Sequence, residues 1–445
     1  MTSQPYNLSA ENDDMPASIS SAAIHVIGTD AAGLDHLATP LQELVLSAQG
    51  LAAPRRLLPQ LPSWWQQQQT DQPLPELMAS DQPEALIAWL HQLQGTAVVL
   101  ASGDPLWFGI GRRLLEACSA DQLHFHPAPS SLQLAFARLG RPWQDAAWIS
   151  LHSRDPAPLA QKLQQRPSAL AVLTDPSRGG AEEVRTILRA SGLEAAYAMW
   201  LCEQLGHANE RVQRLTPQDA LPSDLHPLHM VVLLAEQAAP PGDPAKLPLF
   251  GLDDGLFLQH DDRPGLMSKR ELRVQLLAEL ELPEQGVLWD LGAGVGSVGL
   301  EALRLRPQLQ LLAVEKRGGG AALIKANAAR LAVQPAAVLE VEALSLLNGT
   351  DLPAKLSNPD RVLLGGGGRQ RAALLKAVLQ KLQPHGVVVI PLATVEAMAE
   401  LKPLLQDCGC TVNVSQHQAW RGLPLADGTR MAPMNPVMIF KGTRP

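Results

Sequence analysis

Short apolar runs alternate with amphipathic stretches along most of this chain. In the first half, the runs that fit β-strands fall at residues 24–28, 96–100, 123–126, 148–151, 168–173, 196–201 and 229–235. Between them, apolar positions recur at three- and four-residue spacing, which predicts helices at 84–94, 106–118, 159–165 and 181–190. This alternation predicts an α/β fold of stacked helices and sheets.

The same alternation resumes in the second half, beginning with a predicted helix at 268–280. The strand runs there are residues 287–291, 311–315, 337–341, 361–364, 386–390, 410–414 and 437–440. Seven strands suit a doubly wound, Rossmann-like domain. Residues 60–83 are rich in Pro and Gln, so we expect a loop there, with Trp64 and Trp65 as packing anchors.

Pro and Gly mark the boundary between the two halves, around Pro240, Pro241 and Gly242. We therefore predict a flexible polar tail at 1–20, a first domain at 21–237, a Pro-rich linker at 238–248 and a second domain at 249–445.

The most informative stretch joins an apolar strand to a glycine-rich turn and a helix. Residues 287–291 form the strand and include Asp290, and Gly292, Gly294 and Gly296 follow. Glycines let the backbone turn tightly and approach a ligand closely, and the first N–H groups of the following helix are unpaired. This stretch therefore predicts a cofactor-binding turn.

Two cofactors suit this turn. Gly294, Gly296 and Gly299 satisfy the G-x-G-x-x-G pattern of dinucleotide sites, with Glu315 about 20 residues further on, so an NAD-dependent oxidoreductase is one interpretation. S-adenosylmethionine (AdoMet) is favoured because Asp290 suits a cationic amino-acid tail and would repel a pyrophosphate. Glu315 ends the next predicted strand and can accept hydrogen bonds from both ribose hydroxyls.

Composition narrows the functional classes. The chain of 445 residues is 46% hydrophobic and carries a formal net charge of −8, which disfavours nucleic-acid binding and hence an RNA methyltransferase. No run is long enough to span a bilayer, and residues 1–20 lack a signal-peptide core. The four cysteines lack zinc-ligand spacing, and His124 and His126 have no third ligand nearby. We expect a cytoplasmic protein without a metal or a membrane partner.

Four motifs of the first half carry a family resemblance. They are Val26-Ile-Gly28, Leu100-Ala-Ser-Gly-Asp-Pro-Leu106, Pro127-Ala-Pro-Ser-Ser-Leu-Gln133, and Cys202-Glu-Gln-Leu-Gly206 with Glu210-Arg211. Over about residues 22–236 this order resembles the tetrapyrrole methylase family, and within it the C-5 methyltransferase branch of the corrin pathway.

The second half, about residues 250–445, resembles the C-15 methyltransferase and decarboxylase branch. Its marks, besides the glycine turn, are Asp254-Gly-Leu-Phe257, Pro264-Gly-Leu-Met-Ser-Lys-Arg-Glu-Leu-Arg273, Ala313-Val-Glu-Lys316, Pro359-Asp360 and Asn435-Pro-Val437. The two resemblances imply a two-lobed tetrapyrrole methylase fold followed by a Rossmann-like class I AdoMet methyltransferase domain.

The resemblance also implies two AdoMet sites, one in each domain. In the first domain a cleft between two lobes would be bordered by loops at Gly28, Ser102, Gly103, Asp104, Ser130 and Ser131. In the second, the cofactor positions are Ser268, Asp290, Gly292, Ala293, Gly294, Val295, Gly296, Glu315, Glu342 and Ala343. Thr29 in the first domain, and Val341 and Leu344 in the second, depart from the family pattern, so we expect looser adenine contacts at the second site.

The implied substrate is a precorrin tetrapyrrole. The first domain would methylate C-5, and the second would methylate C-15 and decarboxylate the ring-C acetate. Its carboxylates need cationic partners, and the candidates are Lys269, Arg270, Arg273, Arg421 and Arg430. Lys269 and Asp104 are candidate catalytic residues, His260 is a candidate for the substrate pocket, and no general base is identified. Relatives of both halves self-associate, so we expect a homo-oligomer. The alternative from another class is a corrinoid-binding scaffold with one inactive domain.

Overall fold

The computed structural model describes residues 23–68, 71–152, 155–216, 219–237, 243–349, 351–365, 368–425 and 428–445. The predicted tail at 1–20 and residues 238–242 of the predicted linker lie outside these ranges. The chain divides into two compact units, one of residues up to Pro142 with Gln204–Arg211, the other of Trp143–Glu203 with Val212–Pro445. Both units are α/β, as the hydrophobic pattern predicts.

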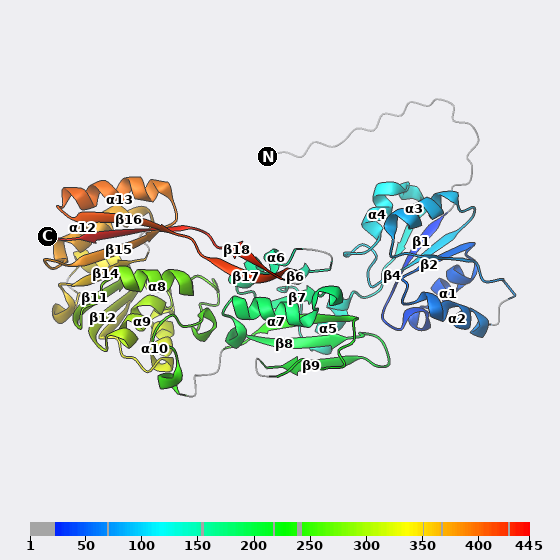
Figure 1. Ribbon diagram of the computed structural model, residues 1–445, viewed down its shortest axis with the longest axis horizontal. Helices are drawn as coiled ribbons and strands as arrows, with labels where there is room; N and C mark the ends of the chain where they lie inside the picture. Colours follow the sequence, from blue (N-terminus) through cyan, green and yellow to red (C-terminus); the bar gives the residue numbers. More distant parts are fainter. Residues whose placement is uncertain are drawn as a thin grey trace, which may run out of the picture. The chain divides into compact units, whose positions relative to one another are not determined.

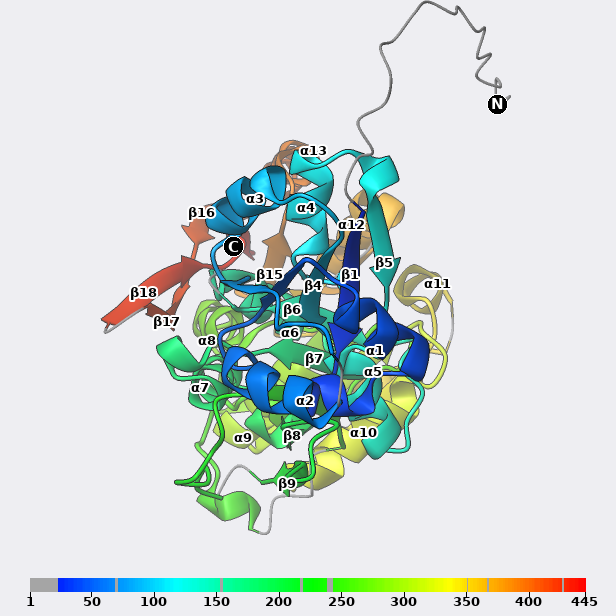
Figure 2. The same ribbon diagram turned by 90° about the vertical axis from the view of Figure 1, so that its right-hand side faces the viewer.

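The first unit is built on a five-stranded sheet in the order β3-β2-β4-β1-β5. Its strands are β1 (Ile24–Thr29), β2 (Gly50–Ala53), β3 (Glu76–Ala79), β4 (Ala97–Ser102) and β5 (Leu123–His126). Its helices are α1 (Thr39–Leu46), α2 (Leu61–Gln67), α3 (Pro83–Gln92), α4 (Gly111–Ala117) and α5 (Ser131–Arg138). All the strand pairs are parallel, and β1 lies between β4 and β5 (Figure 2). The carboxyl ends of these three strands therefore meet at one edge.

Two local predictions for this unit were wrong. The stretch at 60–83 is not a loop, because α2 and β3 fall within it; Trp64 and Trp65 are buried, as predicted. The helix expected from Leu106 begins only at Gly111, because the chain after Pro105 first folds back so that the Gly111 N–H donates to the Pro105 carbonyl.

The second unit begins with another five-stranded sheet, in the order β6-β7-β10-β8-β9. It contains β6 (Ala147–Ser150), β7 (Ala169–Leu173), β8 (Tyr197–Glu203), β9 (Arg211–Leu215), β10 (His229–Ala235), α6 (Ala157–Gln164) and α7 (Ala181–Ala190). The sheet is mixed, since β10 runs antiparallel to β7 and β8. We call this part of the second unit the middle lobe.

The remainder of the second unit is a Rossmann-like domain whose described residues include a seven-stranded sheet, ordered β13-β12-β11-β14-β15-β19-β16 (Figure 1). Its strands are β11 (Gln285–Leu291), β12 (Gln308–Glu315), β13 (Ala337–Glu340), β14 (Arg361–Leu364), β15 (Val387–Leu392), β16 (Thr411–His417) and β19 (Val437–Thr443). All seven coincide with predicted runs. The first five strands are parallel, and β19 is antiparallel to its neighbours.

Helices cover both faces of this sheet because its strands alternate their apolar side chains between two cores. Trp289 and Leu291 face one core with α11 (Ala343–Asn348), α12 (Arg371–Lys381) and α13 (Val395–Asp407). Leu288 and Leu311 face the other with α8 (Arg270–Glu279), α9 (Ser297–Leu305) and α10 (Gly320–Arg330). The chain order reverses around β11, which places a topological switch point between β11 and β14.

A hairpin that the sequence did not reveal joins the Rossmann-like domain to the middle lobe. It consists of β17 (Trp420–Leu425) and β18 (Gly428–Pro433), drawn in red in Figure 1. Leu423 is buried within the apolar core of the middle lobe. Arg430 forms an ion pair with Asp155, with Nη1 2.9 Å from Oδ2. The Rossmann-like domain thus contributes directly to the middle lobe's core.

Candidate functional site

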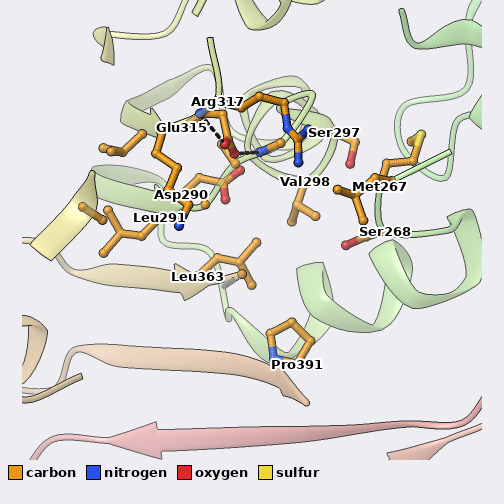
Figure 3. Close-up of a pocket in the computed structure, with 18 of the residues that line it drawn as sticks. Met267, Ser268, Asp290, Leu291, Ser297, Val298, Glu315, Arg317, Leu363 and Pro391 are labelled. Carbon is orange, nitrogen blue, oxygen red and sulfur yellow. Dashed lines mark hydrogen bonds between the residues drawn. The ribbon is translucent and has the colours of Figure 1, made fainter. Parts of the chain in front are cut away.

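A cavity of about 470 Å³ lies at the carboxyl edge of the seven-stranded sheet (Figure 3). Its walls come from the ends of β11, β12, β14 and β15 and from the segment before α8. This is the position where ligands bind in open α/β sheets, beyond the carboxyl ends of strands at the switch point. The volume falls within the range of about 300–1,000 Å³ that is usual for small-molecule sites.

The glycine turn after β11 forms the floor of this cavity. Gly292, Gly294 and Gly296 all adopt positive φ, at 77°, 59° and 81°, so a side chain at any of them would strain the backbone. Gly296 caps α9, whose first residue, Ser297, also lines the cavity. The turn therefore brings main-chain atoms and a helix N-terminus to the ligand space.

Two carboxylates flank the turn. Glu315, at the end of β12, accepts hydrogen bonds from the Gly294 N–H (2.8 Å) and the Arg317 N–H (2.9 Å), both drawn in Figure 3. Asp290 accepts from the Gly299 N–H at 3.1 Å. Burial raises the pKa of Asp290 to about 7, the Gly299 hydrogen bond opposes this shift, and the nearby Glu315 charge adds to it.

Most cofactor positions predicted for this domain line the cavity. They are Ser268, Asp290, Gly292, Ala293, Gly294, Glu315, Glu342 and Ala343. Val295 and Gly296 do not line it; Val295 is buried in the core that contains α9. His260, suggested by the sequence for the substrate pocket, also lines this cavity. Residues not predicted include Met267, Ser297, Val298, Lys316, Arg317, Leu363 and Pro391. Lys316 and Arg317 directly follow β12, and Ser297 and Val298 directly follow the glycine turn. Because ligands in open α/β sheets bind beyond the carboxyl ends of the strands, these positions could have been predicted from the sequence.

The cations proposed to bind substrate lie outside the cavity lining. Arg273 is fully buried, where Nε donates to Glu301 at 2.9 Å and Nη1 to Asp254 at 2.6 Å. Its guanidinium also lies over the Phe257 ring, 4.9 Å from the centroid. The substrate-binding prediction for Arg273 is therefore wrong, because a fully enclosed guanidinium cannot reach a ligand.

The other predicted cations also have protein partners. Lys269 Nζ donates to the Gly265 carbonyl at 2.9 Å, and burial lowers its pKa. Arg421, in β17, donates to both carboxylate oxygens of Glu271 at 2.7 and 2.8 Å and to the Ser191 carbonyl of the middle lobe. Arg270 is paired with Asp253 at 3.4 Å on the surface. Arg421 and Arg430 thus hold the hairpin in place.

In the first unit, the predicted cofactor residues gather at the carboxyl edge of β1, β4 and β5. The Gly103 N–H donates to the Thr29 carbonyl at 2.6 Å, and a Cβ added at Gly28 would lie 2.1 Å from the Gly103 oxygen. Ser130 caps α5 through a reciprocal pair of bonds with Gln133. Backbones approach so closely here that Gly28 tolerates no side chain.

The remaining predicted residues lie at the same edge. Asp104 Oδ1 accepts from the Leu106 N–H at 2.9 Å, Ser131 opens α5, and Arg56 Nη2 donates to the Ser102 hydroxyl at 2.9 Å. A Cβ at Gly103 would lie 3.2 Å from Ser130 Cα. The three predicted loops therefore meet, and Arg56 is a neighbour that the motifs did not indicate.

Histidines also cluster on β1 and β5. His25 Nδ1 lies 3.0 Å from His126 Nε2, and its ring stacks on His124 with centroids 4.9 Å apart. Burial lowers the pKa of His25 and His126, and neighbouring histidines lower both further. Within the described ranges, no group of three or more His, Cys, Asp or Glu side chains is arranged to hold a metal ion. Nor does any described helix have the length and apolar character to cross a bilayer.

Two family models match the chain, one over the first unit and the middle lobe together and the other over the Rossmann-like domain. Residues 23–220 match the family model of tetrapyrrole (corrin/porphyrin) methylases, and residues 258–444 match that of a precorrin methyltransferase domain. The fold and the cavity therefore belong to a methyltransferase assembled from two methyltransferase families.

Individual relatives narrow the family further. A Sinorhizobium sp. precorrin-6Y C(5,15)-methyltransferase [decarboxylating] is 34% identical over 305 residues, which are 68% of this chain and 70% of the relative. A cobalt-precorrin-6B C(15)-methyltransferase (decarboxylating) of Salmonella typhi is 31% identical over 42% of this chain and 94% of its own length. The crystal structure of a precorrin-6y C5,15-methyltransferase from Geobacter metallireducens GS-15 is 28% identical, covers 45% of this chain and all of that chain, and has a TM-score of 0.40.

The chain belongs to the family of decarboxylating precorrin-6Y C(5,15)-methyltransferases.

Proposed function

We propose that this protein is a bifunctional AdoMet-dependent methyltransferase of corrin synthesis. The tetrapyrrole methylase part methylates C-5 of a precorrin, and the Rossmann-like domain methylates C-15 and removes the ring-C acetate carboxyl group as CO2. The observation that carries the proposal is the cavity bounded by Asp290, the glycine turn and Glu315, within a chain of this family.

The residues of this cavity suit AdoMet. The carboxylate of Glu315 can accept the ribose hydroxyls, and the buried carboxyl of Asp290 suits the cationic amino-acid tail. The positive-φ glycines keep the turn free of side chains that would fill the ligand space. When bound, AdoMet supplies an electrophilic methyl group. The chain's own task is to orient donor and acceptor and to keep the site dry, for which Leu363 and Pro391 provide an apolar wall.

A second AdoMet site is proposed at the edge formed by Gly28, Ser102–Asp104 and Ser130–Ser131. The support is the close approach of three loops at the carboxyl ends of parallel strands. Asp104 remains a candidate catalytic residue here. Self-association and a cytoplasmic location stay predictions from the sequence.

Mass spectrometry of the corrinoid product tests the proposed function. The full-length protein is incubated with AdoMet and a reduced precorrin-6 substrate. We expect two methyl groups to be gained and one CO2 to be lost. An unchanged substrate mass, in a sample where AdoMet binding is shown by calorimetry, would exclude the corrin assignment.

The raised pKa of Asp290 predicts a pH-dependent cofactor affinity. The ionised carboxylate attracts a cationic tail and the neutral acid does not, so affinity rises as pH increases toward about 7. Between pH 5.5 and 7.0 the cofactor's amino group stays charged, and the ionised fraction of a carboxyl with a pKa of about 7 rises from about 3% to about 50%, so we expect up to about 15-fold tighter binding. Calorimetric titration with AdoMet measures this change. The Rossmann-like site is identified as the binding event that disappears in a Gly294→Arg variant.

The control is Asp290→Asn, which keeps the shape of the side chain and cannot ionise. Its affinity at that site should be nearly constant over the same pH range. An equally steep dependence in Asp290→Asn would assign the titration to another group.

A further inference from the structure

His260 lines the Rossmann-like cavity and has a buried imidazole nitrogen with no hydrogen-bond partner in the described part of the chain. That nitrogen is Nε2, which is shielded from solvent. Buried polar atoms are nearly always paired, so an unpaired one in a ligand cavity points to a bond that the ligand completes.

The position of His260 is well defined. Its segment is fixed on one side by Leu258, whose N–H donates to Asn327 Oδ1 at 2.8 Å while Asn327 Nδ2 donates to the Leu258 carbonyl at 3.2 Å. On the other side, Arg317 Nη1 lies 2.5 Å from Asp262 Oδ2. Because Asn327 is fully buried, the segment is held against α10 and the loop after β12. The backbone on both sides of His260 is thus held in place by these contacts.

The neighbours of His260 indicate which part of a ligand it meets. A Cβ built on Gly320 would lie 2.6 Å from Glu315 Cγ and 3.7 Å from His260 Cε1, so the imidazole and the Glu315 side chain flank the same glycine. Glu315 is the carboxylate placed to accept ribose hydroxyls. Figure 3 shows Glu315 and Arg317 together, away from Pro391, on the other side of the cavity.

We propose that His260 binds the ribose of the cofactor through Nε2, opposite Glu315. This inference rests on the proposed use of AdoMet at this site. A hydroxyl can donate to or accept from an imidazole nitrogen, so the contact suits a sugar and does not require a charged histidine. His260 would be a cofactor-binding residue that contributes to affinity and takes no part in methyl transfer.

The test is calorimetric titration of the full-length protein with S-adenosylhomocysteine and with its 2′,3′-dideoxy analogue. The Rossmann-like site is identified as the one that disappears in Gly294→Arg. One hydrogen bond to a ligand is worth about 1 kcal/mol, so His260→Ala should weaken S-adenosylhomocysteine binding about 5-fold to 10-fold at this site. With the dideoxy analogue the same substitution should change affinity less than about 2-fold, because the contacted group is absent.

Two further variants control this comparison. Asp261→Ala, at the exposed neighbouring position, should bind both ligands as the wild type does. His260→Gln keeps a polar nitrogen and should therefore retain more affinity than His260→Ala. If His260→Ala does not fold, His260→Gln is used in its place in the comparison of the two ligands. Equal losses for both ligands, or no loss, would overturn the ribose assignment. Absence of wild-type binding at this site would overturn the proposed AdoMet use as well, whereas intact binding without corrinoid methylation would overturn only the proposed function.

Discussion

Replacing Arg273 with methionine should lower the free energy of unfolding of the Rossmann-like domain by about 3–5 kcal/mol. Methionine fills similar space but removes the cation that lies between the buried carboxylates of Asp254 and Glu301. Asp254 is then left with Arg421 at 3.8 Å, and Glu301 with the N–H groups of Gly251 and Leu252. Both carboxylates are shielded from solvent, so neither can be rehydrated without local opening. The guanidinium also bonds the Ser268 and Leu252 carbonyls, and these acceptors lose their donor too. Urea denaturation of the full-length protein, followed by circular dichroism, measures the loss.

Arg270→Met is the matched control on the same helix. Arg270 is exposed and its partner Asp253 lies 3.4 Å away on the surface, so the loss should be at most about 1 kcal/mol. Similar losses in the two variants would contradict the assignment of Arg273 to a buried ionic cluster.

Arg270 and Arg273 illustrate what the sequence alone could not predict, namely the partner of each side chain. Arg270 and Arg273 lie in the same motif, and a carboxylate-rich substrate made both plausible ligands. Only the fold reveals that Asp254 and Glu301 enclose Arg273. Arg421 is a similar case, because its partner Glu271 is 150 residues away in sequence. Long-range ion pairs leave no local pattern, so the sequence could not reveal the protein partners of Arg273 and Arg421.

Elements with a strong apolar pattern were predicted well. Five of the seven described strands of the Rossmann-like sheet, β11, β12, β14, β15 and β19, contain a run of buried residues, and each coincides with an apolar run of the sequence. Asp290, Gly294 and Glu315 lie at or just after the ends of β11 and β12. The missed elements have weak patterns. Strand β2 is the short Gly50-Leu-Ala-Ala53, with little β-propensity, and the β17–β18 hairpin gains its apolar contacts from the middle lobe. Their formation depends on tertiary contacts, which local periodicity does not report.

The largest functional effect is expected from Gly294→Arg. Gly294 has φ of +59°, and its N–H donates to Glu315, so a side chain there strains the turn and projects into the cavity. We expect C-15 methylation and decarboxylation to fall about 100-fold or more, since displacement of a bound reactant by about 1 Å can cost that much. C-5 methylation should persist, because the proposed residues for that reaction belong to the other compact unit.

Gly28→Ala is the corresponding change at the other site. An added methyl group would lie 2.1 Å from the Gly103 carbonyl and 2.6 Å from the Ala128 nitrogen, so the loops bordering the proposed first site must move. We expect C-5 methylation to fall while decarboxylation persists. Circular dichroism and retained binding at the unaltered site show whether each variant is folded.

The most direct test of the central claim is therefore a mass analysis of the products of these two variants, each incubated with AdoMet and the reduced precorrin. The proposed division of labour predicts complementary products: Gly294→Arg adds one methyl group and releases no CO2, and Gly28→Ala adds one methyl group and releases CO2. If a folded Gly28→Ala or Gly294→Arg protein lost both methylations together, or if either variant behaved as the wild type, two independent sites with separate reactions would be contradicted. A domain that binds AdoMet but never methylates would instead support the corrinoid-binding scaffold.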